Sequence, residues 1–401
     1  MSNTENLQLQ VVQDIQGFQS LQSEWDELVL ETSGNMFLMH TWLSAWWKNY
    51  GDRCHLYTLV VRDGLEMIGA LPLMFQRGLG GVRRLQFMGS GEVTPNHLGI
   101  VVRPAKQAEV TQIILEHLSS MRLKWDVLEL NKLLADGDLP KLLKSYFEMH
   151  HMVNDLTIYT RCAYIDLPST FEEYLKTRSH NKRRNLHKSK KKLINDYPST
   201  KFAFVQTPDE LSKVLTRLIE LHQIRWTAKG YPGAFATQRF RQFHYEVSLL
   251  FLKRGELRLS YLEVDSKIIA VCYCYKVKDV MQGYLPSFDE QWANYSPGSV
   301  LKAYTIEQAI QQGAKEYDFL EGEESDKYSW ATNFRENLML RVYAASWRGM
   351  LNHFNALVLD SIKELGIKYV PVKIRRPLWQ FLLRLSVVQA TTSTENTEET
   401  P

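Results

Sequence analysis

The chain has 401 residues, of which 44% are hydrophobic and 23% charged, and its formal net charge is +3. This length favours two packed domains over one, the composition excludes a chain that is disordered throughout, and no apolar run approaches the length of a membrane span. Four cysteines are too few for a disulfide framework and their spacing fits no zinc site, so we expect buried reduced thiols and no metal.

The first half of the chain predicts a mixed α/β unit. Its opening residues are polar and acidic, unlike a signal peptide, so we expect a cytoplasmic protein. Periodicity and turn signals then predict, in chain order, helices Leu21–Thr32 and Thr41–Tyr50, strands His55–Arg62, Met67–Phe75 and Arg84–Met88, a helix from Pro104 to about Leu123, and strand Asp126–Leu130.

The second half repeats this order of elements with little identity of sequence. The predicted elements are helix Asp209–Thr227, strands Leu257–Val264, Lys267–Val277 and Val280–Pro286, a helix of about Pro297–Gln312, and strand Glu316–Leu320. A further apolar run, Leu338–Ser346, should pair near the edge of the sheet or beside it.

A strongly basic segment precedes the second unit. Arg178–Lys192 contains eight of the 48 basic residues and no acid, so the remaining 40 are outnumbered by 45 acidic residues. We expect a helix with Ser179 among its start signals. It could be a solvated face, or it could bind the phosphates of an acyl carrier, a nucleotide sugar, RNA or an anionic membrane. The run has no aromatics between its charges, which argues against nucleic acid.

Ser296-Pro297-Gly298 marks the start of the late helix. Ser296 is a natural N-cap, Pro297 suits the first helical position, and Gly298 keeps bulk away from the exposed N–H groups. Such a helix start can bind an anion, although an ordinary cap is the simpler interpretation. The Gly-rich turns of the first half carry no equivalent triplet.

The C-terminal region divides into two parts. Asn352–Leu365 has helical periodicity, and Ile374–Leu385 is basic, aromatic and apolar. We favour a closing helix on the core for the latter, with contact to a membrane surface or a synthase as the alternative. The predicted organisation is an N-terminal domain (1–155), a C-terminal domain (156–350), a helical extension (351–388) and a disordered tail (389–401).

Three antiparallel strands, a helix and a parallel strand are the core order of the GNAT (acyl-CoA N-acyltransferase) fold, and the chain resembles the CelD-like GNAT acetyltransferases of cellulose and exopolysaccharide gene clusters over roughly residues 20–350. The residues that carry the resemblance are Arg183-Arg184-Asn185-Leu186, Leu221-His222, Arg225-Trp226, Gly230, Gly233-Ala234-Phe235, Ser296-Pro297-Gly298, Ala309, Gly313, Tyr317-Asp318-Phe319-Leu320, Gly322, Glu323-Glu324, Lys327 and Trp330. The chain departs from that family at Glu321, where Arg is common, and at Asp326, where Tyr is common.

The resemblance implies tandem GNAT-like domains in the α/β (α+β) class, each a mixed, mostly antiparallel sheet flanked by helices. In that fold two neighbouring strands part, the pantetheine arm of acyl-CoA lies between them, and the diphosphate sits on the following helix start. The cofactor-binding residues implied are Leu285, Ser296, Pro297, Gly298, Ser299, Val300 and Leu301. The duplicated unit and basic segment are also similar to Fem-type peptidyltransferases, which use aminoacyl-tRNA.

Acyl transfer from a thioester needs a polarised carbonyl, a base for the acceptor and an acid for the thiolate. Backbone N–H groups near Leu285 could polarise the carbonyl. The candidates for the base are Asp318 and Glu323, although Asp318 could instead cap a loop or pair with Lys327. Tyr284, Tyr317 and Tyr328 are candidate acids or packed aromatics, and Lys327 completes the catalytic candidates.

The candidate acceptor-binding residues are His222, Arg225 and Trp226, which share a helix face, with Arg183 and Arg184. We therefore predict transfer of an acyl group, expected to be acetyl, from acyl-CoA to an amine or hydroxyl, in polysaccharide or cell-envelope biosynthesis. The alternatives are an aminoacyl-tRNA-dependent peptidyltransferase, which would bind tRNA, and a non-catalytic adaptor of a polysaccharide synthase at the inner membrane.

Overall fold

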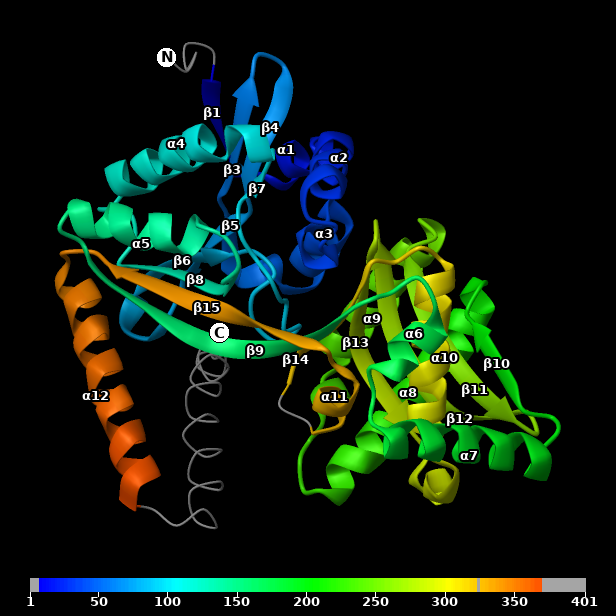
Figure 1. Ribbon diagram of the computed structural model, residues 1–401. Coiled ribbons are helices and arrows are strands. Elements are labelled where there is room, and N and C mark those ends of the chain that lie inside the picture. Colours follow the sequence, from blue (N-terminus) through cyan, green and yellow to red (C-terminus); the bar gives the residue numbers. More distant parts are fainter. Residues whose placement is uncertain (1–6, 323–324, 370–401) are drawn as a thin grey trace, which may run out of the picture.

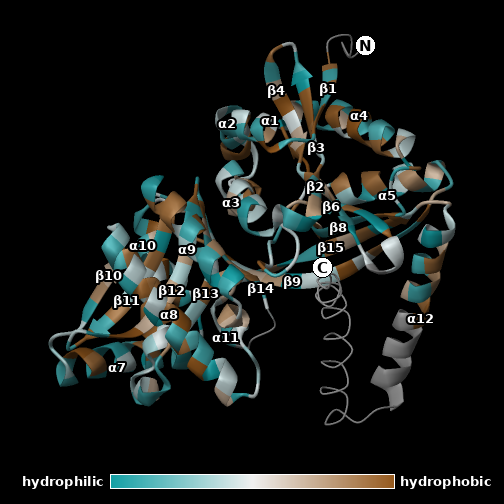
Figure 2. Ribbon diagram, turned by 180° about the vertical axis from the view of Figure 1, so that it is seen from behind, coloured by the Kyte–Doolittle hydropathy of each residue, from teal (hydrophilic) through white to brown (hydrophobic). Residues whose placement is uncertain are grey.

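The computed structural model describes residues 7–322 and 325–369. These residues form two α/β units that lie side by side, joined by two long strands (Figures 1 and 2). The fold is therefore the predicted tandem GNAT-like arrangement, with mixed sheets flanked by helices.

The N-terminal unit begins with a strand and two α-helical segments that lead into α3. Its elements are β1 (Leu7–Val12), α1 (Ile15–Ser20), α2 (Gln22–Thr32), α3 (His40–Tyr50), β2 (Cys54–Leu56), β3 (Thr58–Asp63), β4 (Glu66–Leu71), β5 (Leu73–Arg77), β6 (Arg83–Phe87), β7 (Val101–Val102), α4 (Gln107–Ser120), β8 (Val127–Leu134) and α5 (Leu139–Met149).

The C-terminal unit follows the long strand β9 (Val153–Asp166). Its elements are α6 (Phe171–Lys176), α7 (His180–Asp196), β10 (Lys201–Phe204), α8 (Pro208–Ala228), α9 (Gln238–Lys253), β11 (Leu257–Val264), β12 (Lys267–Val277), β13 (Val280–Phe288), α10 (Pro297–Gln311), β14 (Glu316–Glu321), α11 (Ser325–Trp330), β15 (Asn333–Tyr343) and α12 (Trp347–Tyr369).

One sheet of eleven strands runs through both units, in the order β10-β11-β12-β13-β14-β9-β15-β8-β6-β5-β2, and a smaller sheet has the order β1-β3-β4-β7. β9 pairs with β14 of the C-terminal unit and, along its whole length, with β15. β15 pairs in turn with β8 of the N-terminal unit. The expected position of the apolar run Leu338–Ser346 near the sheet edge is therefore wrong, because β15 lies inside the sheet between β9 and β8.

The predicted elements are confirmed most closely in the second unit, where β11 and β12 have the expected bounds and α10 ends one residue earlier than expected. In the first unit the two predicted long strands are each broken once, at Tyr57 and at Pro72, so that β2 and β5 join the large sheet while β3 and β4 join the small one. Proline lacks the N–H that a continuous ladder would need. The predicted domain boundary at 155/156 falls inside β9.

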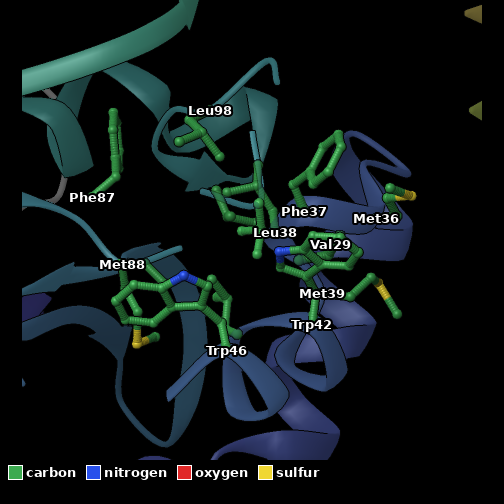
Figure 3. Packing of buried hydrophobic residues seen from close by; sticks show 14 of the residues in the cluster. Val29, Met36, Phe37, Leu38, Met39, Trp42, Trp46, Phe87, Met88 and Leu98 are labelled. Carbon is green, nitrogen blue, oxygen red and sulfur yellow. The ribbon is translucent and has the colours of Figure 1, made fainter. Parts of the chain in front are cut away.

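Buried hydrophobic residues lie on both faces of the C-terminal part of the large sheet. α6, α7 and α10 bury Tyr174, Leu186 and Val300 against one face, and α8 and α9 cover the other. The core on the side of α8 and α9 continues into the N-terminal unit, where Trp42 and Trp46 of α3 are buried among the side chains of Figure 3. Continuous burial across the seam means that the two units stabilise one another through the hydrophobic effect.

The described part of the predicted extension is helical, since α12 includes the predicted helix Asn352–Leu365. The predicted interfacial segment 374–385 and the tail 389–401 lie outside the described residues.

Candidate active site between strands β13 and β14

Strands β13 and β14 start as parallel neighbours and then part. Their only paired residues are Val280 with Glu316, Met281 with Tyr317, and Gln282 with Asp318, although β13 continues to Phe288 and β14 to Glu321. A gap therefore opens after Gln282 on one side and after Asp318 on the other, as the resemblance implies. In the N-terminal unit the corresponding strands β6 and β8 also stop pairing early, but Leu98 bridges to Leu133 beyond that point.

The wall of the gap formed by β13 contains a β-bulge. Opposite β12, Tyr273 pairs with Leu285 and Cys274 with Gly283, which leaves Tyr284 as the extra residue. Gly283, Tyr284 and Leu285 are half-buried and Pro286 is exposed. A bulge turns backbone groups out of the ladder, so the backbone near Leu285 can bind a carbonyl in the gap.

The start of α10 has free backbone donors. Ser296 is the residue before the helix, as predicted, but it is in the left-handed conformation with φ of 49°, and its side chain makes no capping hydrogen bond. The predicted N-cap position of Ser296 is confirmed, but its hydroxyl does not cap the helix. Gly298 is half-buried, and a Cβ there would lie 3.0 Å from Cδ1 of Phe288. The uncapped helix start leaves N–H groups and the positive end of the helix dipole available for an anion.

Two cations stand beside this helix start. The guanidinium of Arg225, at the end of α8, lies 5.6 Å from the ring centroid of Phe288. The ammonium of Lys192, on α7, lies 4.5 Å from the ring centroid of Tyr295, which precedes Ser296. Neither cation makes an ion pair with any described residue, so both can contribute to binding a diphosphate.

Asp318 does not face the gap as a free carboxylate. Its side chain is 1% exposed, its Oδ2 accepts a hydrogen bond of 2.7 Å from Nε2 of His97, and its Oδ1 accepts one of 2.7 Å from the Leu320 N–H. The expected alternation of this strand is confirmed, since Tyr317 and Phe319 pack in the core on the opposite face. The sequence did not reveal His97 as the partner, because it lies 221 residues away in an irregular loop.

Glu321 and Lys327 lie at the far end of β14. Oε1 of Glu321 accepts a hydrogen bond of 2.8 Å from Nζ of Lys132, which comes from β8 of the other unit. Nζ of Lys327 donates to the main-chain oxygen of Glu321. Lys327 therefore holds the backbone of this turn. Glu323, the second candidate base, lies outside the described residues.

The three candidate tyrosines have different surroundings. Tyr284, the extra residue of the bulge, packs against the N-terminal unit and α9, where its hydroxyl donates to the Val93 carbonyl at 2.9 Å and lies 3.2 Å from Nε2 of His244. Burial raises its pKa well above the usual range. Tyr317 is buried with its hydroxyl 3.4 Å from Sγ of Cys274. Tyr328 is 39% exposed, and its ring lies tilted against that of Phe334, with the centroids 5.0 Å apart.

The candidate acceptor residues fall into two groups. His222 is buried and packs against Trp226 and Phe235, while Arg225 on the same helix reaches Phe288, so of these residues of α8 Arg225 borders the start of α10. Burial lowers the pKa of His222. Arg183 and Arg184 stand at the other end of α7, next to Lys182, whose Nζ contacts Ser329 of α11.

A separate groove of about 1060 Å³ lies on the seam between α3 and α9. Its walls include Trp47, Lys48, Glu246, Leu249 and Leu250, and it does not include α10 or the parted strands. The groove is therefore distinct from the gap where the donor is expected.

One family model matches the C-terminal unit. Residues 180–328 match the family described as acetyltransferase (GNAT) domain. No curated protein sequence matches the chain. Among the described residues, no helix could cross a membrane, and no group of three His, Cys, Asp or Glu side chains is placed to bind a metal ion.

Three solved structures resemble the whole arrangement at low sequence identity. FemX has a TM-score of 0.60 at 10% identity, with 80% of this chain and 95% of FemX covered. A protein of unknown function from Bacteroides thetaiotaomicron has a TM-score of 0.53 at 12% identity, with 84% of this chain and 100% of that chain covered. The C-terminal domain of a proposed lysylphosphatidylglycerol synthetase from Agrobacterium fabrum has a TM-score of 0.52 at 11% identity, with 85% of this chain and 97% of that chain covered. Residues 180–328 are thus similar to the acetyltransferase (GNAT) domain family, and the chain shares its fold with these solved structures.

Proposed function

We propose that this protein is an acyltransferase that moves an acyl group, expected to be acetyl, from acyl-CoA to an amine or hydroxyl acceptor. The observation that carries the proposal is that the gap between β13 and β14 lies beside a helix start without a side-chain cap. The pantetheine arm would lie in the gap, the carbonyl against the bulge at Leu285, and the diphosphate at Gly298 and Ser299 between Arg225 and Lys192. Polysaccharide or cell-envelope biosynthesis is the setting that the sequence resemblance suggests.

The site residues have distinct tasks in this proposal. Backbone donors at the bulge would stabilise the oxyanion that forms when the acceptor attacks, which is the usual source of rate enhancement in acyl transfer. His222 and Trp226, on the same helix as Arg225, would line the entrance used by the acceptor. The acyl-CoA is a co-substrate.

Calorimetric titration of the full-length protein tests donor binding. We expect saturable binding of CoA and acetyl-CoA, and much weaker binding of pantetheine, which lacks the diphosphate. If CoA produces no binding heat with folded protein, the proposal fails. If pantetheine binds as tightly as CoA, the assignment of the diphosphate to α10 fails.

A second candidate, aminoacyl transfer from tRNA, is favoured by one observation on α7. Arg183, Arg184, Lys188, Lys190, Lys191 and Lys192 make no ion pair with any described residue, so the outer face of this helix is strongly cationic. Binding of tRNA should then fall steeply with salt and disappear when Lys190, Lys191 and Lys192 are replaced by Gln. Filter binding across a salt series decides this, and salt-independent or absent binding would leave acyl-CoA as the donor.

A further inference from the structure

An ion pair joins the two units at the end of β14, beyond its last pair with β13. Nζ of Lys132, on β8, lies 2.8 Å from Oε1 of Glu321, at the end of β14. The Lys132 side chain is 7% exposed, whereas the Glu321 side chain is 23% exposed. Lys132 is thus enclosed, while Glu321 still reaches solvent. A group that exchanges protons requires such access.

Glu321 and Leu285, the expected carbonyl site, both lie beyond the point where β14 and β13 stop pairing. The last paired residues are Gln282 and Asp318, and three residues further along the two parallel strands come Leu285 and Glu321. Leu320 has a φ of 57°, and the pairing of β14 with β9 shifts between Asp318 and Glu321. A non-glycine residue in this conformation is uncommon, and it redirects the side chain that follows.

The negative charge of the Glu321 carboxylate raises the pKa of two nearby tyrosines. Burial raises the pKa of the Tyr284 hydroxyl on β13, and the Glu321 carboxylate adds to this effect. Burial and the Glu321 carboxylate likewise raise the pKa of the Tyr159 hydroxyl on β9. The titratable groups around Glu321 are therefore Lys132 on β8, Tyr159 on β9, Tyr284 on β13 and Lys327 on α11.

We propose that Glu321 is the carboxylate that takes the acceptor's proton, and that Lys132 is the positioning residue that holds it. The inference rests on the proposed acyltransferase function. Glu321 takes the role of base that the sequence suggested for Asp318, because both carboxylate oxygens of Asp318 already accept hydrogen bonds and its side chain is buried. Lys132 holds Oε1, which leaves Oε2 for the acceptor.

The step balances without another reactant. The lone pair of the acceptor nitrogen forms the C–N bond to the thioester carbonyl, and one N–H proton passes to Oε2 of Glu321. The C–S bond then breaks with its electron pair on sulfur. The proton moves from Glu321 to the thiolate, so free CoA leaves and the carboxylate is ionised again. A hydroxyl acceptor follows the same sequence with O–H in place of N–H.

The test compares variants of the full-length protein by thiol release from acetyl-CoA. The variants are Glu321→Gln, Glu321→Asp and Lys132→Met, with Glu263→Gln as a matched control because Glu263 pairs with Lys213 at 3.2 Å away from the gap. Glucosamine and glycinamide serve as acceptor probes. Hydrolysis of acetyl-CoA without an acceptor is followed in parallel, so that every preparation gives a rate. CoA affinity is measured separately by calorimetry.

We expect Glu321→Gln to bind CoA within twofold of the wild type and to lose about 100-fold or more in turnover, the range that a positioned base contributes. The fall in kcat/KM at low pH should vanish in Glu321→Gln. Lys132→Met should lower turnover while its CoA affinity stays within twofold of the wild type, because Oε1 of Glu321 is no longer held in place. Glu321→Asp should retain part of the activity, and Glu263→Gln should match the wild type.

The outcomes separate this inference from the function on which it rests. If the wild type binds CoA and releases thiol, but Glu321→Gln has the same rate and the same pH profile, the assignment of Glu321 is overturned and the acyltransferase stands. If the wild type neither binds CoA nor releases thiol, both are overturned.

Discussion

His97 and Asp318 form a buried charge pair between the two units. His97 donates from Nε2 to Asp318 and from Nδ1 to Oδ1 of Asn337 at 2.8 Å, so both ring nitrogens face acceptors and the ring is an imidazolium. Burial opposes this charge, but Asp318 raises the pKa of His97 to about 10. Burial also raises the pKa of Asp318, but His97 brings it below its usual value.

This pair predicts how stability depends on pH. The pKa of His97 is higher in the folded protein than the value of 6.5 expected when unfolded, so its contribution is complete below pH 6.5 and is lost as pH rises from 6.5 toward 10. The pKa of Asp318 is lower than 3.8, so its contribution is present above pH 3.8 and is lost below it. Denaturant midpoints measured from pH 3 to pH 10 should be highest between about 4 and 6.5.

Replacing His97 tests the same pair directly. His97→Gln leaves Asp318 buried without its cation, which costs about 3–5 kcal/mol of unfolding free energy. The decline above pH 6.5 should also become shallower in this variant. An unchanged midpoint at pH 6 would show that the pair does not stabilise the fold.

At this scale the sequence identified Asp318 but not its environment. Its strand and its face followed from alternation, whereas His97, Asn337 and Lys132 come from other parts of the chain. His97 and Lys132 each have positive φ, of 56°, a conformation that no local pattern around them indicates. The sequence therefore could not predict which distant side chains the tertiary structure brings to Asp318 and Glu321.

The start of α10 is the element that the donor proposal depends on. Gly298→Leu would place a side chain over the N–H groups and against Phe288, since even a Cβ would come within 3.0 Å of that ring. We expect CoA affinity to fall at least about tenfold, which corresponds to about 1.4 kcal/mol. Calorimetry measures the affinity, and thermal melting checks that the fold persists.

A double variant distinguishes packing from ligand binding. Phe288→Ala makes room for the new leucine, so Gly298→Leu with Phe288→Ala should recover thermal stability without recovering affinity. If affinity returns with stability, the amides of this helix start are not the binding site.

At the scale of elements, prediction succeeded where patterns were local. Ser-Pro-Gly and the flanking alternation defined α10, β11 and β12. The strand β9 escaped prediction, because the charged and polar residues in its centre interrupt the alternation, and Thr157, Ile158 and Tyr159 are exposed. Such a strand is stabilised mainly by its neighbours on both sides.

The whole molecule depends on β9 and β15. These strands complete the sheet of the C-terminal unit and connect it to the N-terminal one. A fragment of residues 180–328 would contain β14 without its partner β9 and would lack His97 and Lys132. We expect it to aggregate or to melt without a cooperative transition, because an open strand edge and unpaired buried charges remain.

Circular dichroism during heating, with the full chain as the control, measures this difference. A fragment of residues 180–328 that melts sharply and binds CoA would contradict the view that the units form one structure. The repeated order of elements predicted the duplication, but the shared sheet could not be predicted, since pairing between distant strands leaves no local signal.

Hydrogen exchange of the full-length protein with and without acetyl-CoA tests the central claim most directly, because it locates the donor on the chain. We predict slower exchange of the amides at Gly283–Leu285 and Gly298–Val300, with no change around the groove between α3 and α9. Protection confined to that groove, or no protection at saturating acetyl-CoA, would contradict the account.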